Sequence, residues 1–151
     1  MNSFEYYVEK GEVRKATRDP ALARSLIESA GRRMRFISSQ PINSESATII
    51  HEQVYDALRE LLDSILAMEG YKSYSHIASI SYLKKFAEFN HKEINKLDTA
   101  RQRRNNSKYY GAQTTPEETQ EILAFYKNIR PKIDKKLKEL MEEQSDKSLS
   151  K

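Results

Sequence analysis

Apolar residues recur three and four positions apart through most of this 151-residue chain. That spacing is the period of helices that bury one face, and the alternating runs of Val, Ile and Thr that indicate strands are absent. The pattern predicts helical segments over residues 19–38, 44–70, 73–89, 90 to about 105, and 115–141. We therefore expect an all-α fold, an up-and-down bundle of four to five helices, with no sheet.

Capping motifs mark the predicted starts of these helices. Asp19 supplies a capping oxygen, and Pro20 follows in the first turn, where its missing N–H is tolerated. Ser44 or Ser46 can cap the second helix. Residues 115–118, with the sequence TPEE, form a capping box with proline at the first helical position, which is the clearest helix start in the chain.

Breaking residues mark the predicted ends and bends. Gly70 is expected to end the second helix, and a bend is expected near Asn90. Residues 105–111 are weak helix formers closed by a glycine, so the helix is expected to fray or stop there. Pro131 lies inside the last apolar pattern and is expected to kink that helix or split it in two.

The second helix, residues 44–70, has the broadest apolar face in the chain and is expected at the centre of the bundle. The first helix has a narrower predicted stripe, made of Leu22, Leu26, Ala30, Met34 and Ile37.

The chain is divided here into three parts. Residues 1–18 are mixed in charge and are expected to form a leader with a helical turn around Tyr6 to Val8. Residues 19–141 form the bundle, which at this length is one domain. Residues 142–151 are polar and expected to be disordered.

Composition excludes several classes of protein. There is no cysteine, so disulfides and thiolate metal sites are impossible. No stretch approaches the roughly 18 consecutive apolar residues that a bilayer span requires, and residues 1–10 lack the apolar core of a signal peptide. A cytoplasmic location is expected.

The three histidines do not predict a metal site. His51, His76 and His91 lack the four-residue spacing of a helical ligand pair, so no metal or other cofactor is expected. Each is interpreted as a helix-end or boundary residue, and His76 is expected to pack near the Arg104 region if the bundle folds as predicted.

The net charge of +4 can be assigned to one short segment. Residues 101–108, RQRRNNSK, carry four basic and no acidic groups. Removing these four from the chain's 26 basic residues leaves 22, which equals its 22 acidic residues. A local cluster of positive charge attracts phosphate far better than a diffuse excess, so this segment is the candidate for binding an anion.

Helical spacing divides this segment between two faces. Arg101, Asn105 and Tyr109 are four apart and share one face, while Arg104 and Lys108 share the neighbouring face. Guanidinium groups bind phosphate, amides bind base edges or sugar hydroxyls, and aromatic planes stack on bases. The alternative is a solvated helix end whose cations interact with the helix dipole.

The tyrosines are interpreted by their neighbours. Tyr109 and Tyr110 lie in or beside the basic segment and are candidates for binding. Tyr71, Tyr74 and Tyr82 flank the start of the third helix and are expected to pack against the core.

Three segments of the chain resemble the HEPN domain family (higher eukaryotes and prokaryotes nucleotide-binding), especially its stand-alone archaeal type. They are FEYYVEKGEVRKATRDPALARSLIESA, LLDSILAMEGYKSYSHIASISYLKKF and RQRRNNSKYYG, in the family's order and spacing. The resemblance implies a bundle of four or five helices that commonly dimerises.

The family's signature is an arginine, usually followed by a polar residue, with a histidine four to six positions later. Arg104 and Asn105 look like the first two members. Tyr109 or Tyr110 stands where the histidine would be, as in a sizeable branch of the family. In active HEPN ribonucleases a ribose 2′-hydroxyl attacks the adjacent phosphate without a metal. A tyrosine, with its pKa near 10, is a poor base for that reaction.

The leading hypothesis is a homodimer that binds RNA or a nucleotide through the basic segment, in a toxin–antitoxin-type pair with a small nucleotidyltransferase. Two alternatives stay open. One is a metal-independent endoribonuclease, a toxin, with Arg104 and Tyr109 as catalytic residues. The other is a helical interaction module without nucleic-acid activity. The residues expected to bind RNA or nucleotide are Arg101, Arg103, Arg104, Asn105, Lys108, Tyr109 and Tyr110.

Overall fold

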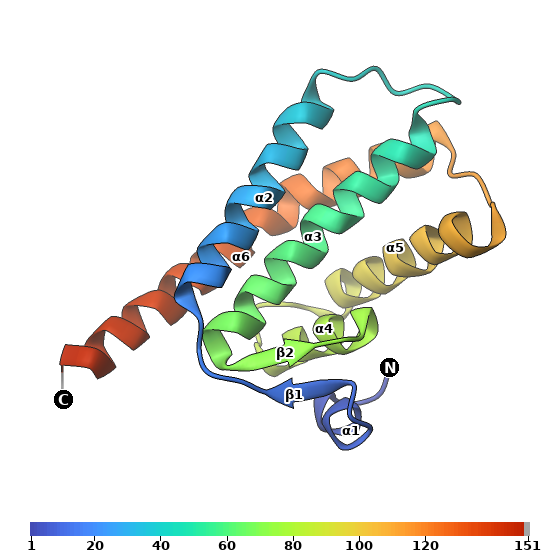
Figure 1. The fold of residues 1–151 in the computed structure, drawn as a ribbon. Coiled ribbons are helices and arrows are strands. Elements are labelled where there is room, and N and C mark those ends of the chain that lie inside the picture. The colour runs from blue at the N-terminus through green and yellow to red at the C-terminus, as the bar shows by residue number, and fades with distance from the viewer. Residues whose placement is uncertain (150–151) are drawn as a thin grey trace.

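The computed structural model describes the backbone of residues 1–149 and the side chains of residues 1–143. This part of the chain is mostly helical, as the hydrophobic pattern predicted, with six α-helices and one two-stranded sheet (Figure 1). The elements in chain order are α1 (Phe4–Glu9), β1 (Val13–Lys15), α2 (Pro20–Ser38), α3 (Ala47–Glu69), β2 (Tyr71–Ser73), α4 (His76–Tyr82), the 3-10 turn η1 (Leu83–Lys85), α5 (His91–Tyr110) and α6 (Pro116–Leu149).

The helix α3 lies at the centre of the fold, as its broad apolar face predicted. It packs against α2 and α6 on one side and against α4 and α5 on another (Figure 1). Leu58, Leu61 and Ile65 of α3 are fully buried, and Ile129 and Ile133 of α6 belong to the same core. Burial of each such side chain stabilises the fold by about 1.5–3 kcal/mol, so this core holds the long helices together.

The helix α2 begins as predicted and buries Ala30 and Ile37 of the predicted stripe, but the stripe differs at its first residue. The Asp19 carboxylate accepts a hydrogen bond from the Leu22 amide at 3.0 Å, which caps the helix. The Leu22 side chain, however, is 46% exposed, and Ala23 is fully buried in its place. Leu22 and Ala23 differ by 100° around the helix, and both fit a helical period with Ala30 and Ile37. The small Ala23 allows closer helix packing, which periodicity alone does not reveal.

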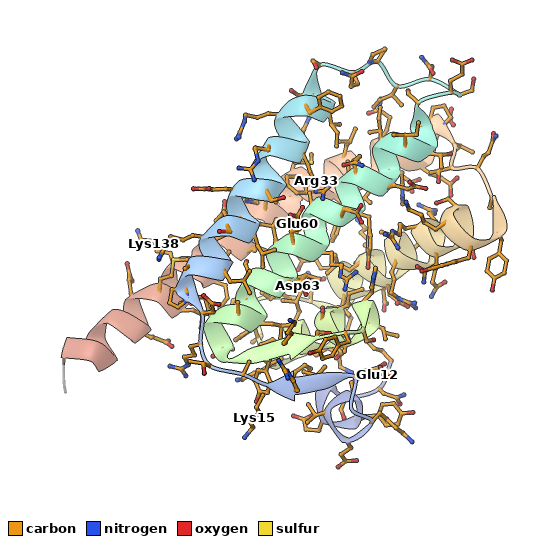
Figure 2. The ribbon with its side chains drawn as sticks, in the orientation of Figure 1. Glu12, Lys15, Arg33, Glu60, Asp63 and Lys138 are labelled. Atoms are coloured by element: carbon orange, nitrogen blue, oxygen red, sulfur yellow. The ribbon has the colours of Figure 1, made fainter. Side chains whose placement is uncertain are left out.

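A polar clamp joins α2 to α3. The Arg33 side chain reaches across to Glu60, with which it forms an ion pair (Figure 2). Its Nη1 also donates to the Gln53 side chain at 2.7 Å. Because both acceptors are on α3, the guanidinium fixes the relative position of the two helices.

The expectation of no sheet was wrong. β1 and β2 pair antiparallel, with Val13 opposite Ser73 and Lys15 opposite Tyr71. Each strand has three residues, too few to show an alternating pattern in the sequence. The predicted leader, residues 1–18, thus forms α1 and β1, and its Phe4 and Tyr7 are buried in the core.

Gly70 connects α3 to this sheet. It has a φ of 82°, the left-handed conformation that ends α3 as predicted. Its carbonyl accepts a hydrogen bond from the Ala16 amide, and a Cβ at this position would lie 3.0 Å from the Ala16 carbonyl oxygen. The turn therefore needs glycine both for its φ and for the close approach of β1.

The third predicted helix, 73–89, is shorter than expected. Ser75 caps α4, which ends at Tyr82 and continues only as the turn η1. Phe86 then adopts an extended backbone, and its ring packs edge-on against Tyr82. Asn90, the predicted bend, forms a reciprocal capping box with Glu93 and starts α5. The capping box and the aromatic packing together override the apolar pattern that continued to Phe89.

The helix α5 continues to Tyr110 and ends at Gly111, so the fraying expected from residue 105 is not observed. The Ser107 hydroxyl donates to Glu52 of α3 at 2.9 Å, and neighbouring cations of α5 form ion pairs with α3. These tertiary contacts outweigh the weak intrinsic helix propensity of residues 105–110.

The helix α6 starts at the predicted capping box. The Thr115 hydroxyl accepts from the Glu118 amide, and the Glu118 carboxylate accepts from the Thr115 amide. The helix is continuous through Pro131, so the predicted split does not occur. Ile129 and Ile133, fully buried on either side of the proline, hold the helix on the core.

The tail predicted to be disordered, residues 142–151, is helical over residues 142–149, where α6 continues to Leu149, and residues 150 and 151 lie outside the described residues. Within the described helices, none is both long and apolar enough to cross a bilayer.

Candidate functional site

One face of α5 lines a surface hollow, as the four-residue spacing predicted. Arg101, Asn105 and Tyr109 stand on successive turns of this face. They line a hollow of about 350 Å³ together with Glu12, Tyr74, Ser75, His76 and Ile77. The hollow thus combines α5 with the start of α4 and with the two loops that flank the small sheet.

Arg101 is the cation of this hollow. Its Nε donates to Asp98, one turn earlier in α5, at 2.8 Å. The side chain is 18% exposed. Among the described side chains, none accepts a hydrogen bond from its terminal nitrogens. The guanidinium is therefore oriented by Asp98 and keeps N–H donors for an anion.

Arg104 and Lys108 face α3. Arg104 Nη2 lies 3.5 Å from Asp56, and Lys108 Nζ lies 3.6 Å from Glu52. The acidic residues on α3 are four apart, like the basic residues on α5, so the two helices pair in register. The basic segment is therefore not the uncompensated cluster that its sequence implied.

Arg103 faces α6, and Tyr110 faces solvent. Arg103 forms an ion pair with Glu118 at 2.8 Å and donates a hydrogen bond to Glu121 at 3.1 Å. Tyr110 is 83% exposed and lies outside the hollow. Of the seven predicted binding residues, the structure thus brings only Arg101, Asn105 and Tyr109 together.

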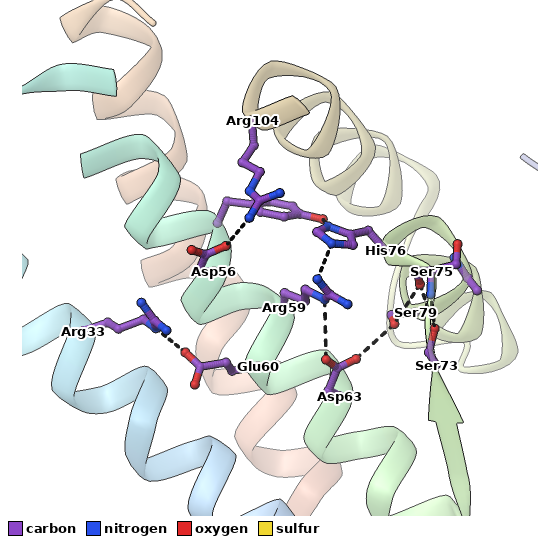
Figure 3. A network of polar contacts seen from close by, with 12 residues as sticks. Arg33, Asp56, Arg59, Glu60, Asp63, Ser73, Ser75, His76, Ser79 and Arg104 are labelled. Carbon is purple, nitrogen blue, oxygen red and sulfur yellow. Dashed lines mark hydrogen bonds and ion pairs between the residues drawn. The ribbon is translucent and has the colours of Figure 1, made fainter. Parts of the chain in front are cut away.

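His76 connects the hollow to a buried polar network (Figure 3). Its Nε2 receives a hydrogen bond from Arg59. Because arginine can only donate, Nε2 is unprotonated, and the neutral ring donates from Nδ1 to the Tyr55 hydroxyl at 3.1 Å. The His76 ring also stacks on that of Tyr55, with the planes 12° apart.

The network continues from Arg59 to Asp63. Arg59 lies 3.6 Å from the Asp63 carboxylate, which also accepts a hydrogen bond from the Ser79 hydroxyl at 3.0 Å. Burial raises the pKa of Asp63, while the neighbouring Arg59 and Ser79 act in the opposite direction. Asp63 and Ser79 thus fix Arg59, and Arg59 in turn orients His76.

Electrostatics keep His76 neutral. Burial lowers its pKa to about 4, and the positive charges of Arg59, Arg104 and Arg101 act in the same direction. His76 was expected to pack near the Arg104 region, and the effect of the Arg104 charge on the pKa of His76 agrees with that expectation. At neutral pH the positive charge next to the hollow therefore belongs to arginines, and the imidazole acts as a neutral hydrogen-bonding group.

The sequence did not predict the second aromatic residue of the hollow. Tyr71 and Tyr82 pack against Phe4, as expected of core aromatics. Tyr74 instead lines the hollow and is 57% exposed. It lies in the link between β2 and α4, where no helical period exists to reveal which way a side chain points.

No protein-family model, curated protein or solved structure matches the chain. Among the residues that the structure describes, no three His, Asp or Glu side chains are grouped as metal ligands. The arrangement offers one oriented guanidinium, one amide, two exposed phenol rings and a neutral imidazole around a shared hollow.

Proposed function

We propose that this chain is a HEPN-like helical bundle that binds RNA or a nucleotide in the hollow on α5. The observation that carries the proposal is the placement of Arg101, Asn105 and Tyr109 around one hollow with Tyr74 and His76. The resemblance of three sequence segments to the HEPN family supports the same class of ligand.

Four of the side chains that line the hollow, those of Arg101, Asn105, Tyr74 and Tyr109, carry groups that single-stranded RNA binding uses. Arg101 can donate two hydrogen bonds to a phosphate, and Asn105 can bind a base edge or a 2′-hydroxyl. Tyr74 and Tyr109 are 57% and 73% exposed, so their rings are accessible to stacking bases. A hollow of about 350 Å³ suits one or two nucleotides of a flexible strand better than a rigid duplex.

The other basic residues of the segment have a supporting function in this proposal. Arg103, Arg104 and Lys108 are held by carboxylates of α3 and α6, so they position α5 and add to the local potential. Tyr110, at the exposed end of α5, lies outside the hollow and has no binding function in this proposal.

Binding to short single-stranded RNA tests the proposal. Arg101→Gln is expected to weaken the affinity about tenfold and to lower the salt dependence by about one phosphate contact. Arg24→Gln is a matched control, because it removes the same charge from an exposed position on α2. Fluorescence anisotropy over a salt series measures the affinity and its salt dependence for each variant. Equal effects of the two substitutions would show that binding depends on net charge and not on the hollow.

The proposal includes a homodimer and a small nucleotidyltransferase as partner, as the HEPN resemblance implies. The exposed Tyr109 and Tyr110 would then lie where two α5 helices approach each other. Light scattering after size exclusion is expected to give twice the chain mass of 17.6 kDa. Co-expression with a nucleotidyltransferase encoded beside this chain is expected to give a complex of fixed ratio, whereas separate elution would remove the partner from the proposal.

A metal-independent endoribonuclease is the second candidate function. One observation favours it: His76 lines the same hollow as Arg101 and Tyr109, although the motif on α5 lacks a histidine. Both ring nitrogens of His76 are bonded, to Tyr55 and to Arg59, so His76 could take the proton of an attacking 2′-hydroxyl only after the Arg59 contact opens. RNA incubated with the protein and EDTA should then yield fragments with cyclic phosphate ends, and Tyr109→Phe should suppress them. Intact RNA would eliminate this candidate and leave binding.

A further inference from the structure

A second cavity lies where α5 and α6 diverge over α3. Its volume is about 340 Å³. Its lining includes His51 of α3, Lys96, Ala100 and Arg103 of α5, and Ile122 and Phe125 of α6. At 100° per residue, these α5 positions lie roughly opposite the face that carries Arg101, Asn105 and Tyr109. The two sites therefore use different sides of the same helix.

His51 is the unexpected residue of this cavity. The side chain is fully buried, yet neither ring nitrogen has a hydrogen-bond partner within the described part of the protein. An unpaired buried polar group destabilises a fold, and an apolar side chain of similar size would avoid that loss. The unused donor and acceptor of His51 are therefore available to a molecule in the cavity that it lines.

The rest of the lining combines apolar surface with the charged side chains of Lys96, Arg103 and Glu121. Ala100, Ile122 and Phe125 are buried and form apolar walls. Lys96 is exposed, with its ammonium 5.9 Å from the centre of the Phe125 ring, and no carboxylate among the described side chains pairs with it. Arg103 is fixed at the cavity by Glu118 and Glu121. Among the described side chains that line the cavity, Lys96 is thus the cation without a carboxylate partner, and it stands beside the apolar wall.

We propose that this cavity binds a small planar heterocycle that carries an anionic group. The ring packs against Phe125 and Ile122, and one of its heteroatoms bonds to one ring nitrogen of His51. The anion interacts with Lys96. The volume is at the lower end of the roughly 300–1,000 Å³ of ligand pockets, so the cavity suits one small molecule.

Four probes test the ligand class. AMP and nicotinate are heterocycles with a phosphate and a carboxylate, and adenosine and nicotinamide are their neutral counterparts. At least one anion is expected to bind in a 1:1 ratio by titration calorimetry, about tenfold more tightly than its neutral counterpart. Binding of AMP alone indicates a nucleotide, and binding of nicotinate alone indicates a free heterocyclic acid. Absence of binding by all four, or equal binding of charged and neutral forms, would overturn the proposal.

Two substitutions then locate the bound molecule. Lys96→Gln is expected to weaken binding of the anion about fivefold to tenfold, whereas Lys92→Gln, one turn earlier on the same helix and also exposed, leaves it unchanged. His51→Leu is expected to abolish binding while the thermal midpoint stays the same or rises. Wild-type affinity in His51→Leu, or equal loss in the two lysine variants, would overturn the assignment.

The two sites are distinguished by a reciprocal test. Arg101→Gln is expected to weaken binding to RNA and to leave binding of the small anion unchanged. If Arg101→Gln removes binding of the small anion, the ligand occupies the hollow on the other side of α5, and the cavity proposal fails while the proposed function stands. If the protein does not bind RNA, but the small anion binds and its binding requires His51, the proposed function fails and the cavity proposal stands.

Discussion

His51 and His76 are both packed beside α5, and burial lowers the pKa of each to about 4. Their hydrogen bonding is opposite. His76 bonds through both ring nitrogens, to Tyr55 and to Arg59, whereas His51 bonds through neither. The comparison shows that burial and a lowered pKa do not by themselves distinguish a structural histidine from one available to a ligand. The hydrogen-bond partners do.

The two sides of α5 also differ in the positive side chains that they offer to a ligand. On the His76 side, Arg101 lines an open hollow beside a network in which both ring nitrogens of His76 are already bonded. On the His51 side, Arg103 is neutralised by two carboxylates and only Lys96 lacks such a partner in the described structure. The first side suits an extended polyanion, and the second suits one small molecule that also satisfies the buried ring.

Replacement of each histidine by an apolar residue gives the largest expected contrast. His76→Phe leaves the Tyr55 hydroxyl and one nitrogen of Arg59 unpaired, so the free energy of unfolding is expected to fall by about 2–3 kcal/mol. His51→Leu removes a group that has no partner, so it is expected to leave stability unchanged or to raise it by about 1 kcal/mol. Urea denaturation at pH 7.5 measures both, and similar losses in both variants would contradict the comparison.

The pH dependence of stability gives the next largest effect. A histidine with a pKa of 6.5 when unfolded and about 4 when folded binds its proton more weakly in the native state. The unfolded state therefore takes up protons first, and stability falls as the pH drops from about 7 to 4 and levels off below that. The full shift sets an upper bound near 3 kcal/mol per histidine, and roughly 2 kcal/mol is expected for the buried His51.

His51→Leu isolates this contribution. His51 faces Arg103, Glu118 and Glu52, and burial is the largest cause of its lowered pKa. The difference between wild type and the variant should therefore shrink as the pH rises from 4 to 7, by the same roughly 2 kcal/mol. Denaturation curves at half-unit pH intervals provide the measurement. A constant difference over this range would mean that His51 titrates normally in the folded protein.

Arg101 and Arg104 are three residues apart on α5 and are expected to respond in opposite ways. Arg104→Gln breaks a partly buried contact with Asp56, so it should lower stability by about 1 kcal/mol and change RNA affinity less than about threefold. Arg101→Gln should lower RNA affinity about tenfold with little loss of stability. Parallel urea and anisotropy measurements separate the two, and a larger binding loss for Arg104 would restore the sequence-based choice of that residue.

The local signals in the sequence predicted the helices and one face of the site. The four-residue spacing of Arg101, Asn105 and Tyr109 placed them on one face, and the capping box at residues 115–118 fixed the start of α6. These features depend only on residues within one or two helical turns of each other. Over that range the helical period predicts which side chains share a face.

The features that the sequence did not predict depend on contacts between distant segments. Counting charges along the chain gave residues 101–108 an unbalanced positive charge, but Asp56 and Glu52 approach them from α3, about fifty residues earlier. The pairing of Val13 with Ser73 has the same origin. Tyr74 entered the hollow because a loop placed it there. No local pattern reports such contacts, since only the packed helices bring these residues together.

The two tyrosines at the end of α5 give the smallest expected effect and the finest test of the comparison. Tyr109 is 73% exposed and lines the hollow, while Tyr110 is 83% exposed and lies outside it. Both substitutions by Ser should change stability by less than about 0.5 kcal/mol, because neither ring is buried. Stacking on one base contributes at least about 1 kcal/mol, so Tyr109→Ser should weaken RNA binding about fivefold and Tyr110→Ser less than twofold. Anisotropy at one low salt concentration suffices, since neither change alters charge. If the two variants lose affinity equally, bases stack along the exposed end of α5 and the hollow beside His76 is not where the strand binds.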